Sequence, residues 1–435
     1  MRILFLTSDL PFRSIRHGGG ELNFNTLSHL ARSHEVHLLS FIRDEEKPFL
    51  PEVRKICRSV RVVPALRGWF SRLRRLPLLL RHPYPVVATD SLRMKRELRA
   101  LVSREHFDLV HVDYFHMGQY LQVIPESLPR VLLFHDIPGP VLRQQIRIAR
   151  GIGKALLYRE WSLSRRWEKL YAIRARNIFV LSRKDQRVIE SWDVRVKCFL
   201  LPPLFGDRFF EVPAGETEPG SVLFVGAMHR PVNIDAALLL RNRIMPLVAR
   251  ECPGARLAVV GNNPPSRLRA LSGRDFLVTG AVESIEPFLA KAAVFAAPLR
   301  VAGGVIVKIL QAMAAGKPVV ASRCANAGIG AEEEGEILLA DRPEDFARRV
   351  IELLKDPGRA AALGQAARRF VEERFNPARA RQRIDEIYVS AARLAEDLGE
   401  GGGPAPAIAR PARPRDRGRD PNYSAAKRLK RRKNY

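Results

Sequence analysis

Short runs of apolar residues recur along the chain, and stretches with helical periodicity separate most of them. In the first half the apolar runs are RILFLT, EVHLLSF, VRVVPA, FDLVHVDY, RVLLFH and NIFVLS, and in the second half they are SVLFVGA, ARLAVVG, DFLVTG, AVFAAP, PVVAS and ILLA. The helical patterns cover residues 21–33, 91–104, 234–251, 285–292, 305–315 and 343–355. Continuous apolar strands that alternate with helices indicate parallel sheets with helices on both faces.

The composition of the chain divides it into segments. Residues 211–221, EVPAGETEPGS, are polar and precede a new strand, which favours a domain boundary. We therefore predict an α/β protein with two doubly wound Rossmann-like domains, 1–210 and 211–375, that face each other across a cleft. A helical segment, 376–398, follows. Residues 399–435 are rich in Gly, Pro and Arg and have little to bury, so we expect a disordered basic tail.

The charge of the chain is strongly positive. The formal net charge is +27, and residues 401–435 contribute 11 Lys/Arg and two Asp, so two thirds of that charge lies in the rest of the chain. A protein with this positive charge attracts the phosphate groups of a nucleotide, an anionic lipid or a nucleic acid. Because no nucleic-acid-binding module is recognisable, charge alone would give only salt-sensitive binding, and we expect no specific nucleic-acid partner. The basic end, AAKRLKRRKNY, is either a solvated tail or an anchor to an anionic surface.

The sequence favours a cytoplasmic location. The start, MRILFLTSDLP, reads as a first strand because its apolar part is too short for a signal peptide. No uncharged run of about 18 apolar residues predicts a membrane-spanning helix. Four scattered cysteines without metal-ligand spacing, Cys57, Cys198, Cys252 and Cys324, suggest reduced thiols.

Two glycine-rich helix starts are candidate anion-binding sites. The first is HGGGEL, with Gly18, Gly19 and Gly20, and the second is AGGVIVK, with Gly303 and Gly304. Glycine lets an anion approach the free N–H groups of a helix start, although glycines at such positions can also serve only the turn. Neither a G-x-G-x-x-G spacing nor a P-loop motif is present, which argues against nicotinamide, flavin and P-loop nucleotide sites.

Polar side chains beside these loops extend the candidate site. Gly304, Lys308 and Gln311 are spaced to share one flank of a helix, which suits a diphosphate followed by a ribose. His135 and Asp136 follow directly after the strand RVLLF, where binding and catalytic groups are often found in parallel sheets. The alternatives are that Lys308 is an ordinary surface lysine and that His135 and Asp136 are a lone polar pair without a role in a site.

Together these segments resemble the GT-B glycosyltransferases of family 4, particularly bacterial members that build exopolysaccharide. The resemblance covers about residues 1–395, and its most specific part is PLRVAGGVIVKILQAMAAGKPVVAS. Further matching stretches include GGGELNFNTLSHLARSHEVHLLSF, FDLVHVDYFHMGQYL, FHDIPGP and FVGAMHRPVNIDAALLL. The resemblance also implies that the helical segment 376–398 crosses back onto the first domain.

The resemblance implies a hexosyltransferase that retains anomeric configuration and needs no metal or other cofactor. It implies a nucleotide-sugar donor, held mainly by the second domain, and a saccharide or lipid-linked acceptor near the first. Its expected donor site contains Gly226, Arg300, Gly303, Gly304, Lys308 and Gln311, and its expected catalytic residues are His135, Lys308 and Arg230. His135 is expected to contact the transferred sugar or the acceptor, while Gly18, Gly19, Gly20 and Asp136 line the acceptor or phosphate loop.

The chain departs from the family pattern at four positions. Gly303 and Gln311 stand where many members carry glutamates, and Ala227 and Val232 lie near positions where many carry Arg and Lys. Because an amide makes weaker hydrogen bonds to ribose hydroxyls than a carboxylate does, we expect weaker donor binding. A GT-B scaffold that has lost turnover and assists a partner transferase is therefore the alternative function.

Two basic segments of the first domain predict contact with a membrane. Residues 66–86 interleave Arg with Trp, Phe and Leu, and residues 143–176 carry ten Lys/Arg and two Glu. Basic amphipathic segments bind anionic membrane surfaces, although a solvated helix face has a similar composition. We predict reversible attachment to the inner face of the cytoplasmic membrane.

Overall fold

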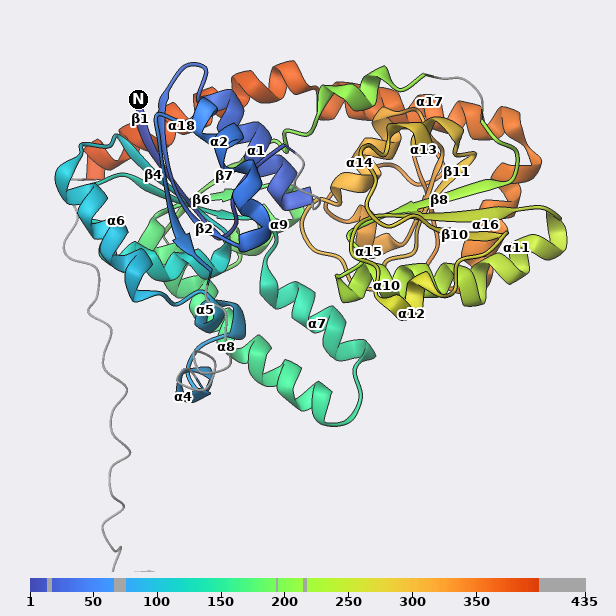
Figure 1. Cartoon of the computed structure of the whole chain (residues 1–435), viewed down its shortest axis with the longest axis horizontal. Helices are drawn as coiled ribbons and strands as arrows, with labels where there is room; N and C mark the ends of the chain where they lie inside the picture. Colours follow the sequence, from blue (N-terminus) through green and yellow to red (C-terminus); the bar gives the residue numbers. More distant parts are fainter. Residues whose placement is uncertain (14–17, 66–75, 193–194, 214–216, 399–435) are drawn as a thin grey trace, which may run out of the picture. The chain divides into compact units, whose positions relative to one another are not determined.

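The computed structural model describes residues 1–13, 18–65, 76–192, 195–213 and 217–398. Within these residues the chain forms two parallel sheets, each with helices on both faces (Figure 1). Both sheets have the doubly wound order that is expected when strands and helices alternate. The predicted α/β class, with two doubly wound parallel sheets, is therefore confirmed.

The first sheet has seven strands in the order β3-β2-β1-β4-β5-β6-β7. Their bounds are β1 (Arg2–Thr7), β2 (Glu35–Ile42), β3 (Ser59–Pro64), β4 (Leu109–Asp113), β5 (Arg130–Phe134), β6 (Asn177–Val180) and β7 (Lys197–Leu200). The helices of this part are α1 (Gly18–Leu30), η1 (Asp44–Phe49), α2 (Leu50–Ile56), α4 (Leu76–Leu79), α5 (Tyr84–Ala88), α6 (Leu92–Arg104), η2 (Phe115–Val123), α7 (Pro138–Ile148), α8 (Gly151–Ala175), α9 (Arg183–Glu190) and η3 (Asp207–Glu211).

The second sheet has six strands in the order β10-β9-β8-β11-β12-β13. Their bounds are β8 (Ser221–Val225), β9 (Arg256–Val260), β10 (Phe276–Val278), β11 (Val294–Ala297), β12 (Val319–Ala321) and β13 (Leu338–Leu339). The helices of this part are α10 (Pro231–Leu239), the π-helical η4 (Leu240–Ile244), α11 (Met245–Glu251), α12 (Ser266–Arg269), α13 (Glu286–Lys291), α14 (Val307–Ala314), α15 (Arg323–Asn326), α16 (Pro343–Lys355), α17 (Pro357–Arg374) and α18 (Pro377–Leu398).

Alternate residues of β1 fill two cores, one on each face of the first sheet. Ile3 and Phe5 belong to the cluster that includes apolar residues of α1 and α18, whereas Leu4 and Leu6 belong to the cluster with α6, η2 and α8. Because successive side chains of a strand point to opposite faces, strands buried on both sides need an unbroken apolar run. This requirement explains why the runs were readable in the sequence.

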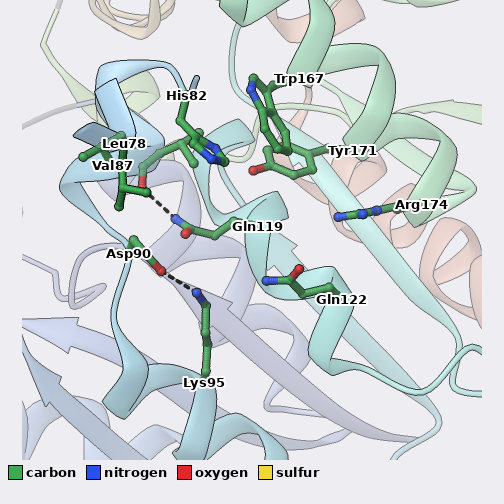
Figure 2. Close-up of a pocket in the computed structure, with 11 residues that line it drawn as sticks. Leu78, His82, Val87, Asp90, Lys95, Gln119, Gln122, Trp167, Tyr171 and Arg174 are labelled. Carbon is green, nitrogen blue, oxygen red and sulfur yellow. Dashed lines mark hydrogen bonds and ion pairs between the residues drawn. The ribbon is translucent and has the colours of Figure 1, made fainter. Parts of the chain in front are cut away.

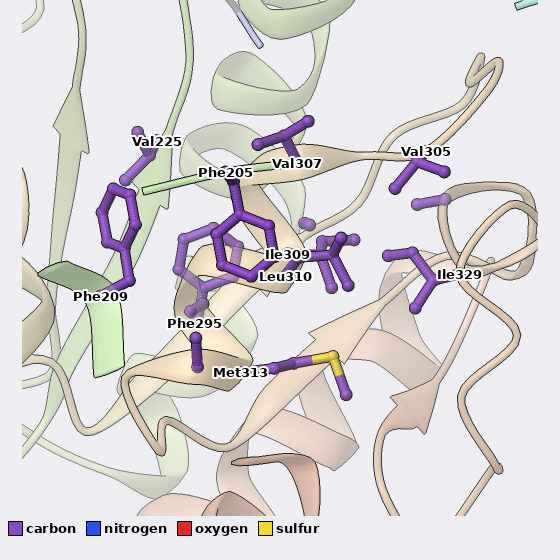
Figure 3. Close-up of a cluster of buried hydrophobic side chains, with 14 of the residues drawn as sticks. Phe205, Phe209, Val225, Phe295, Val305, Val307, Ile309, Leu310, Met313 and Ile329 are labelled. Carbon is purple, nitrogen blue, oxygen red and sulfur yellow. The ribbon is translucent and has the colours of Figure 1, made fainter. Parts of the chain in front are cut away.

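Helix α14 is held in place by its apolar residues. Ile309, Leu310 and Met313 are fully buried, and Figure 3 shows them among Phe295 of β11 and Phe205 and Phe209. Burying side chains of this size stabilises the helix by roughly 1.5–3 kcal/mol each relative to exposure. The opposite flank of α14, which carries the polar residues, is therefore fixed relative to the second sheet.

Several helix bounds differ from those expected from the sequence. Gly18, Gly19 and Gly20 form the first turn of α1, where we had placed them before the helix. Helix α14 begins at Val307, after Ile306 as its N-cap, so Gly303 and Gly304 precede it by three or more residues. Strand β7 and helix α17 were not expected.

The last described helix and the segments at the domain limits complete the fold. Helix α18 contacts α1 and β5 of the first part of the chain.

Two predicted segments lie outside the described residues: the tail, 399–435, and residues 66–75 of the basic segment 66–86. The domain limits at 210, 375 and 398 stay predictions. Among the helices in the described part of the chain, none has the length and apolar content needed to cross a bilayer.

Candidate functional site

The centre of the candidate site in the first sheet is a buried carboxylate, Asp113, the last residue of β4. Asp113 accepts hydrogen bonds from Thr7 Oγ1 at 3.1 Å and from Asn23 Nδ2, and one of its oxygens lies 2.8 Å from His135 Nε2. Burial alone would raise the pKa of Asp113, but His135 and the buried His111 outweigh it and hold that pKa well below its usual value. Asp113 is thus a fixed negative charge that orients His135.

His135 follows β5 directly, and β5 pairs with β4. Its Nδ1 is buried and has no hydrogen-bond partner among the described residues. Buried polar atoms in native proteins nearly always have a partner, so an unpaired one indicates that something else occupies that position. A side chain at Gly19 would cover this atom, because a Cβ there would lie 3.4 Å from Nδ1. The sequence prediction that His135 marks a site is consistent with this geometry, although its role stays a prediction.

Tyr114 adds a strained residue beside His135. Its ring stacks on the His135 ring with centroids 4.2 Å apart, and its φ is 67°. A positive φ is unfavourable for a bulky residue and is concentrated at functional sites. A Cβ at Gly19 would lie 2.6 Å from the Tyr114 hydroxyl, so only glycine leaves room for this ring.

Lys308, in the first turn of α14, is the main cation of the second part of the site. Its Nζ donates to Asn233 Oδ1 at 2.7 Å and lies 4.6 Å from the centre of the Phe224 ring. Burial, and to a lesser degree the charge of Arg230, lower the pKa of Lys308 to about 7. A Cβ at Gly226 would lie 2.6 Å from Nζ, so glycine is needed after β8 to admit the lysine.

Arg230 and Arg300 differ in what surrounds them. Arg230, the exposed N-cap of α10, is close enough to Lys308 and Tyr114 to influence the pKa of both, and no carboxylate pairs with it among the described residues. Arg300 makes a two-point ion pair with Asp235 of α10. The charge of Arg300 is therefore already compensated, whereas Arg230 and Lys308 lack an anion.

Gly303 and Gly304 allow the second part of the chain to approach the first part closely, because a side chain at either position would clash. A Cβ at Gly304, whose φ is 59°, would lie 2.0 Å from the carbonyl oxygen of His135. A Cβ at Gly303 would lie 2.9 Å from Asp136 Oδ2. The expectation that these glycines open the helix is wrong, because α14 begins only at Val307. Anion binding by their N–H groups stays a prediction.

The two glycine-rich segments are nevertheless brought together. A Cβ at Gly18, the first residue of α1, would lie 3.1 Å from Val307 Cγ2, at the first residue of α14. The starts of both helices carry partial positive charge. Together with Lys308 and Arg230, they create a region of the molecule that favours an anion.

Gln311 has a partner that we did not expect. Its Nε2 donates to Glu21 Oε2 of α1 at 2.8 Å. Glu21 in turn lies 3.4 Å from Arg208 Nη2, and Arg208 also pairs with Glu286 at 2.6 Å. Burial raises the pKa of Glu21, while Arg208 and Gln311 act against this change.

Sequence reasoning missed several residues of this constellation. The polar end of FDLVHVDY could have indicated Asp113 and Tyr114, since β4 ends there as β5 ends at His135. Asn233 and Glu21 carried no comparable signal, because ordinary helix positions with a polar residue are common. Their importance comes from tertiary contacts with Lys308 and Gln311.

A separate cavity of about 230 Å³ lies in the first part of the chain (Figure 2). Its walls come from α4, α5, α6, η2 and α8 and include Trp167, Tyr171, Gln122, Arg174 and the Asp90–Lys95 ion pair. None of the residues predicted for the site lines this cavity.

Two family models match the chain. One, described as glycosyltransferase family 4, matches residues 17–203, and the other, described as glycosyl transferases group 1, matches residues 219–356. The first match contains most of the first sheet, and the second contains all of the second sheet. Together they span most of the chain.

Comparison with individual proteins gives matches of full length. An uncharacterised 44.6 kDa protein in the cps region of Klebsiella pneumoniae is 21% identical over 394 residues, which are 86% of this chain and 96% of that protein. Sucrose-phosphate synthase from Thermosynechococcus elongatus superimposes with a TM-score of 0.65 at 18% identity, over 91% of this chain and 100% of that one. HepE from Anabaena, in complex with UDP-glucose, gives 0.61 at 16% identity, over 90% and 100%. At these identities the structural matches establish the fold.

Proposed function

The chain belongs to the GT-B glycosyltransferases of the family 4 type, and from this premise we propose which transfer it catalyses. The proposed reaction moves a hexosyl group from a nucleotide-sugar donor to a saccharide or lipid-linked acceptor with retention of anomeric configuration. The product would serve the synthesis of a cell-surface polysaccharide. The location of the Klebsiella relative in a cps region supports this last part.

One observation carries the proposal: two basic side chains that pair with no carboxylate among the described residues, Lys308 in the first turn of α14 and Arg230 at the N-cap of α10, lie close enough for Arg230 to influence the pKa of Lys308. As the glycosidic bond to the donor breaks, negative charge grows on the nucleoside diphosphate. A buried, fixed cation such as Lys308 stabilises this charge strongly, because it is already oriented and little water screens it, and helix N-termini add partial positive charge. Asn233 keeps Lys308 in position through its 2.7 Å hydrogen bond.

His135 is proposed to act on the sugar side of the bond. Its Nε2 is held by Asp113, so Nδ1 is the atom left to interact with a sugar or acceptor hydroxyl. A carboxylate on the far side of an imidazole fixes the orientation of the ring. The same arrangement would let His135 hold a hydroxyl group while Lys308 and Arg230 receive the diphosphate.

The donor is proposed to be a nucleotide sugar, and no metal ion is proposed to take part. The Anabaena protein has been solved with UDP and with UDP-glucose, which supports this class of donor. In other transferases a divalent cation stabilises the charge of the diphosphate. Here that charge would be stabilised by Lys308, Arg230 and the two helix starts. Activity that persists in a chelator would agree with this proposal.

The experiment is a transfer and hydrolysis assay with purified full-length protein and a panel of nucleotide sugars, beginning with UDP-glucose. We expect slow hydrolysis of one donor and faster transfer when a saccharide or lipid-linked acceptor is added. Donor binding without hydrolysis or transfer would favour the scaffold function, in which the protein assists a partner transferase. No binding of any nucleotide sugar would contradict both functions.

The acceptor is proposed to be presented at a membrane. The hairpin of α7 and α8 exposes Ile152, Leu156 and Tyr158, with exposed fractions of 81%, 61% and 51%. Exposed cations alternate with them, namely Arg143, Arg147, Arg150 and Lys154. Leu80 and Tyr84 are also exposed. Exposed apolar residues among cations suit the interface of an anionic bilayer.

Liposome flotation tests the membrane proposal. Wild-type protein is expected to float with vesicles that contain anionic lipid and to remain in solution with neutral vesicles. The double variant I152E/L156E should lose most of the binding, whereas L277E, which changes an exposed leucine of the second sheet, should not. Equal binding to anionic and neutral vesicles would contradict the proposal.

A further inference from the structure

A second histidine approaches Asp113 from within the first sheet. His111 lies two residues before Asp113 on β4, so both side chains point to the same face of the sheet. Phe5 of β1 is the register partner of His111, and the two rings stack with centroids 4.1 Å apart. His111 Nε2 lies 4.0 Å from Asp113 Oδ1, the oxygen that His135 Nε2 contacts at 2.8 Å. Two imidazoles therefore face one carboxylate oxygen.

The other ring nitrogen of His111 contacts α18. Tyr388 Oη lies 2.8 Å from His111 Nδ1, and this hydrogen bond joins residues 277 positions apart. Both side chains are fully buried, and the Tyr388 ring stacks on that of His111 with centroids 5.7 Å apart. The last described helix of the chain thus reaches a histidine that faces the buried carboxylate.

The surroundings of His111 determine which of its nitrogens carries the proton. Burial lowers the pKa of His111, although Asp113 acts in the opposite direction, so at pH 7 and above the ring is neutral and has one N–H group. With the proton on Nδ1, the Tyr388 hydroxyl would accept from it, the phenol proton would have no acceptor among the described residues, and a lone pair would face Asp113. With the proton on Nε2, the hydroxyl donates to Nδ1 and the N–H group points toward the carboxylate. The second tautomer is favoured, because it satisfies the phenol and turns the positive end of the ring dipole toward Asp113.

We propose that His111 and Tyr388 are a pair of positioning residues, in which the Tyr388 hydroxyl sets the tautomer of His111 and the His111 N–H group holds the Asp113 carboxylate in place for His135. This inference rests on the proposed role of His135 in glycosyl transfer. A separation of 4.0 Å is too long for a hydrogen bond, so the attraction is between an ion and a dipole. Such an attraction is stronger at this fully buried position than in water, because little water screens it. The opposite tautomer would repel the same oxygen.

The variants Y388F, H111F and H111F/Y388F separate positioning from packing. Each single change leaves the other polar group buried without a partner, so Y388F and H111F should melt at lower temperatures than wild type. In H111F/Y388F both polar groups are absent and the new phenyl ring at position 111 can stack on Phe5, so most of the lost melting temperature should be recovered.

Turnover should not recover with stability. After correction for the folded fraction, kcat of H111F/Y388F should stay about three- to tenfold below that of wild type. KM for the donor should be unchanged, because the pair acts through Asp113 and His135 rather than on the nucleotide. A purely structural pair would instead regain its turnover together with its melting temperature.

Two further variants test the route of the effect. In a D113N background, H111F/Y388F should lower kcat no further, because the amide carries no charge for the ring dipole to attract. D385N is the matched control for the docking of α18: it changes the hydrogen bond of that helix to His29, 3.0 Å long, without touching Asp113. D385N should keep the kcat of wild type.

A measurement on wild type decides the tautomer without any assay of activity. Isotopically labelled histidine gives separate nitrogen NMR signals for protonated and unprotonated ring nitrogens, and comparison with H111F/Y388F identifies those of His111. We expect the proton on Nε2. A proton on Nδ1, or the kcat of wild type in folded H111F/Y388F, would overturn the proposal. If wild type transfers no sugar from any nucleotide-sugar donor, the proposed function fails instead, and the tautomer and the melting series still decide whether the pair is coupled.

Discussion

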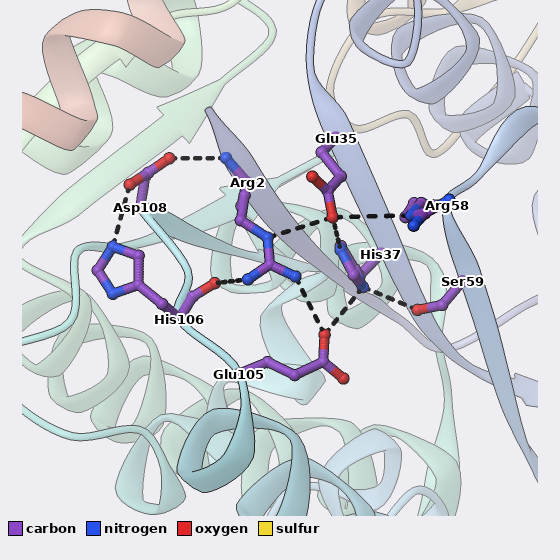
Figure 4. A network of polar contacts seen from close by, with 8 residues as sticks. All are labelled: Arg2, Glu35, His37, Arg58, Ser59, Glu105, His106 and Asp108. Atoms are coloured by element: carbon purple, nitrogen blue, oxygen red, sulfur yellow. Dashed lines mark hydrogen bonds and ion pairs between the residues drawn. The ribbon is translucent and has the colours of Figure 1, made fainter.

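The two ends of the first sheet both carry networks of charged residues, but only one network is complete. At the amino end, His37 of β2 has partners for both ring nitrogens: Ser59 Oγ at 2.8 Å and Glu35 Oε1 at 3.0 Å (Figure 4). Arg2 likewise contacts Glu35 at 3.2 Å and Glu105 at 3.4 Å. At the carboxyl end, His135 has one partner, Asp113, and its Nδ1 has none among the described residues.

This difference separates a structural network from a candidate site. Polar groups that satisfy each other need no ligand, and their removal affects stability. His135 Nδ1 and the buried Lys308 ammonium carry a desolvation cost that a ligand of the right charge would offset, and Arg230 adds an exposed cation that pairs with no carboxylate among the described residues. The position is also the one expected for parallel sheets, whose ligands bind beyond the carboxyl ends of the strands.

The largest effect is expected from K308A at the carboxyl end. Loss of the ammonium should lower kcat about 10²–10³-fold, because the growing charge of the diphosphate loses its nearest cation. The measurement is steady-state turnover with saturating donor. K317A is the matched control, since Lys317 is a buried lysine shortly after α14 that donates to the Ala290 carbonyl and has no role in the site. Unchanged turnover in K308A would remove Lys308 from the site.

The next effect is expected from D113N, which weakens the hold on His135. The loss of a charge-assisted hydrogen bond corresponds to roughly 1.5–3 kcal/mol, or about 10- to 100-fold in kcat. KM for the donor should change much less, because Asp113 acts through His135 rather than on the nucleotide. Loss of folded enzyme alone would also lower the apparent kcat and leave KM unchanged, so the folded fraction is first measured from a melting curve. After correction for that fraction, kinetics at several donor concentrations should still show the lower kcat.

The smallest effect on activity is expected from R2A at the amino end. Arg2 is partly exposed, so its ion pairs are screened by water, and the variant should lose no more than about 1 kcal/mol of unfolding free energy. Both kcat and KM should equal those of wild type. The check is denaturant unfolding beside the turnover assay. An activity loss in folded R2A would show that the complete network is not purely structural.

The sequence predicted the strands better than the site. Strands such as RILFLT were readable because burial on both faces demands continuous apolar residues, whereas the four-residue β7, KCFL, was too short to stand out. The start of α14 was placed two residues too early because Gly303 and Gly304 were taken to open the helix, whereas Gly304 permits close contact with the His135 carbonyl.

Contacts between distant segments explain what was missed in the site. The neighbourhood of Asp113 and His135 follows from the pairing of β4 with β5, which chain order makes plausible. The bond between Gln311 and Glu21 depends on how α1 and α14 meet, and no local pattern encodes that contact. For the same reason the sequence alone indicated weaker donor binding at Gln311, because it could not show that Gln311 donates a hydrogen bond to Glu21 of α1.

The central claim is that the basic side chains at the carboxyl end of the sheet bind the diphosphate of the donor. Proton uptake on UDP binding tests this claim most directly. Burial lowers the pKa of Lys308 to about 7, so at pH 8 this lysine is mostly neutral before UDP binds. A bound diphosphate favours the ammonium and raises the pKa, so binding should take up close to one proton, and affinity should fall by up to about tenfold per pH unit above pH 7. Calorimetry at pH 8 in two buffers of different ionisation enthalpy measures this uptake, with K308M as the control that should show none. UDP binding by wild type with no more proton uptake than K308M would contradict the account.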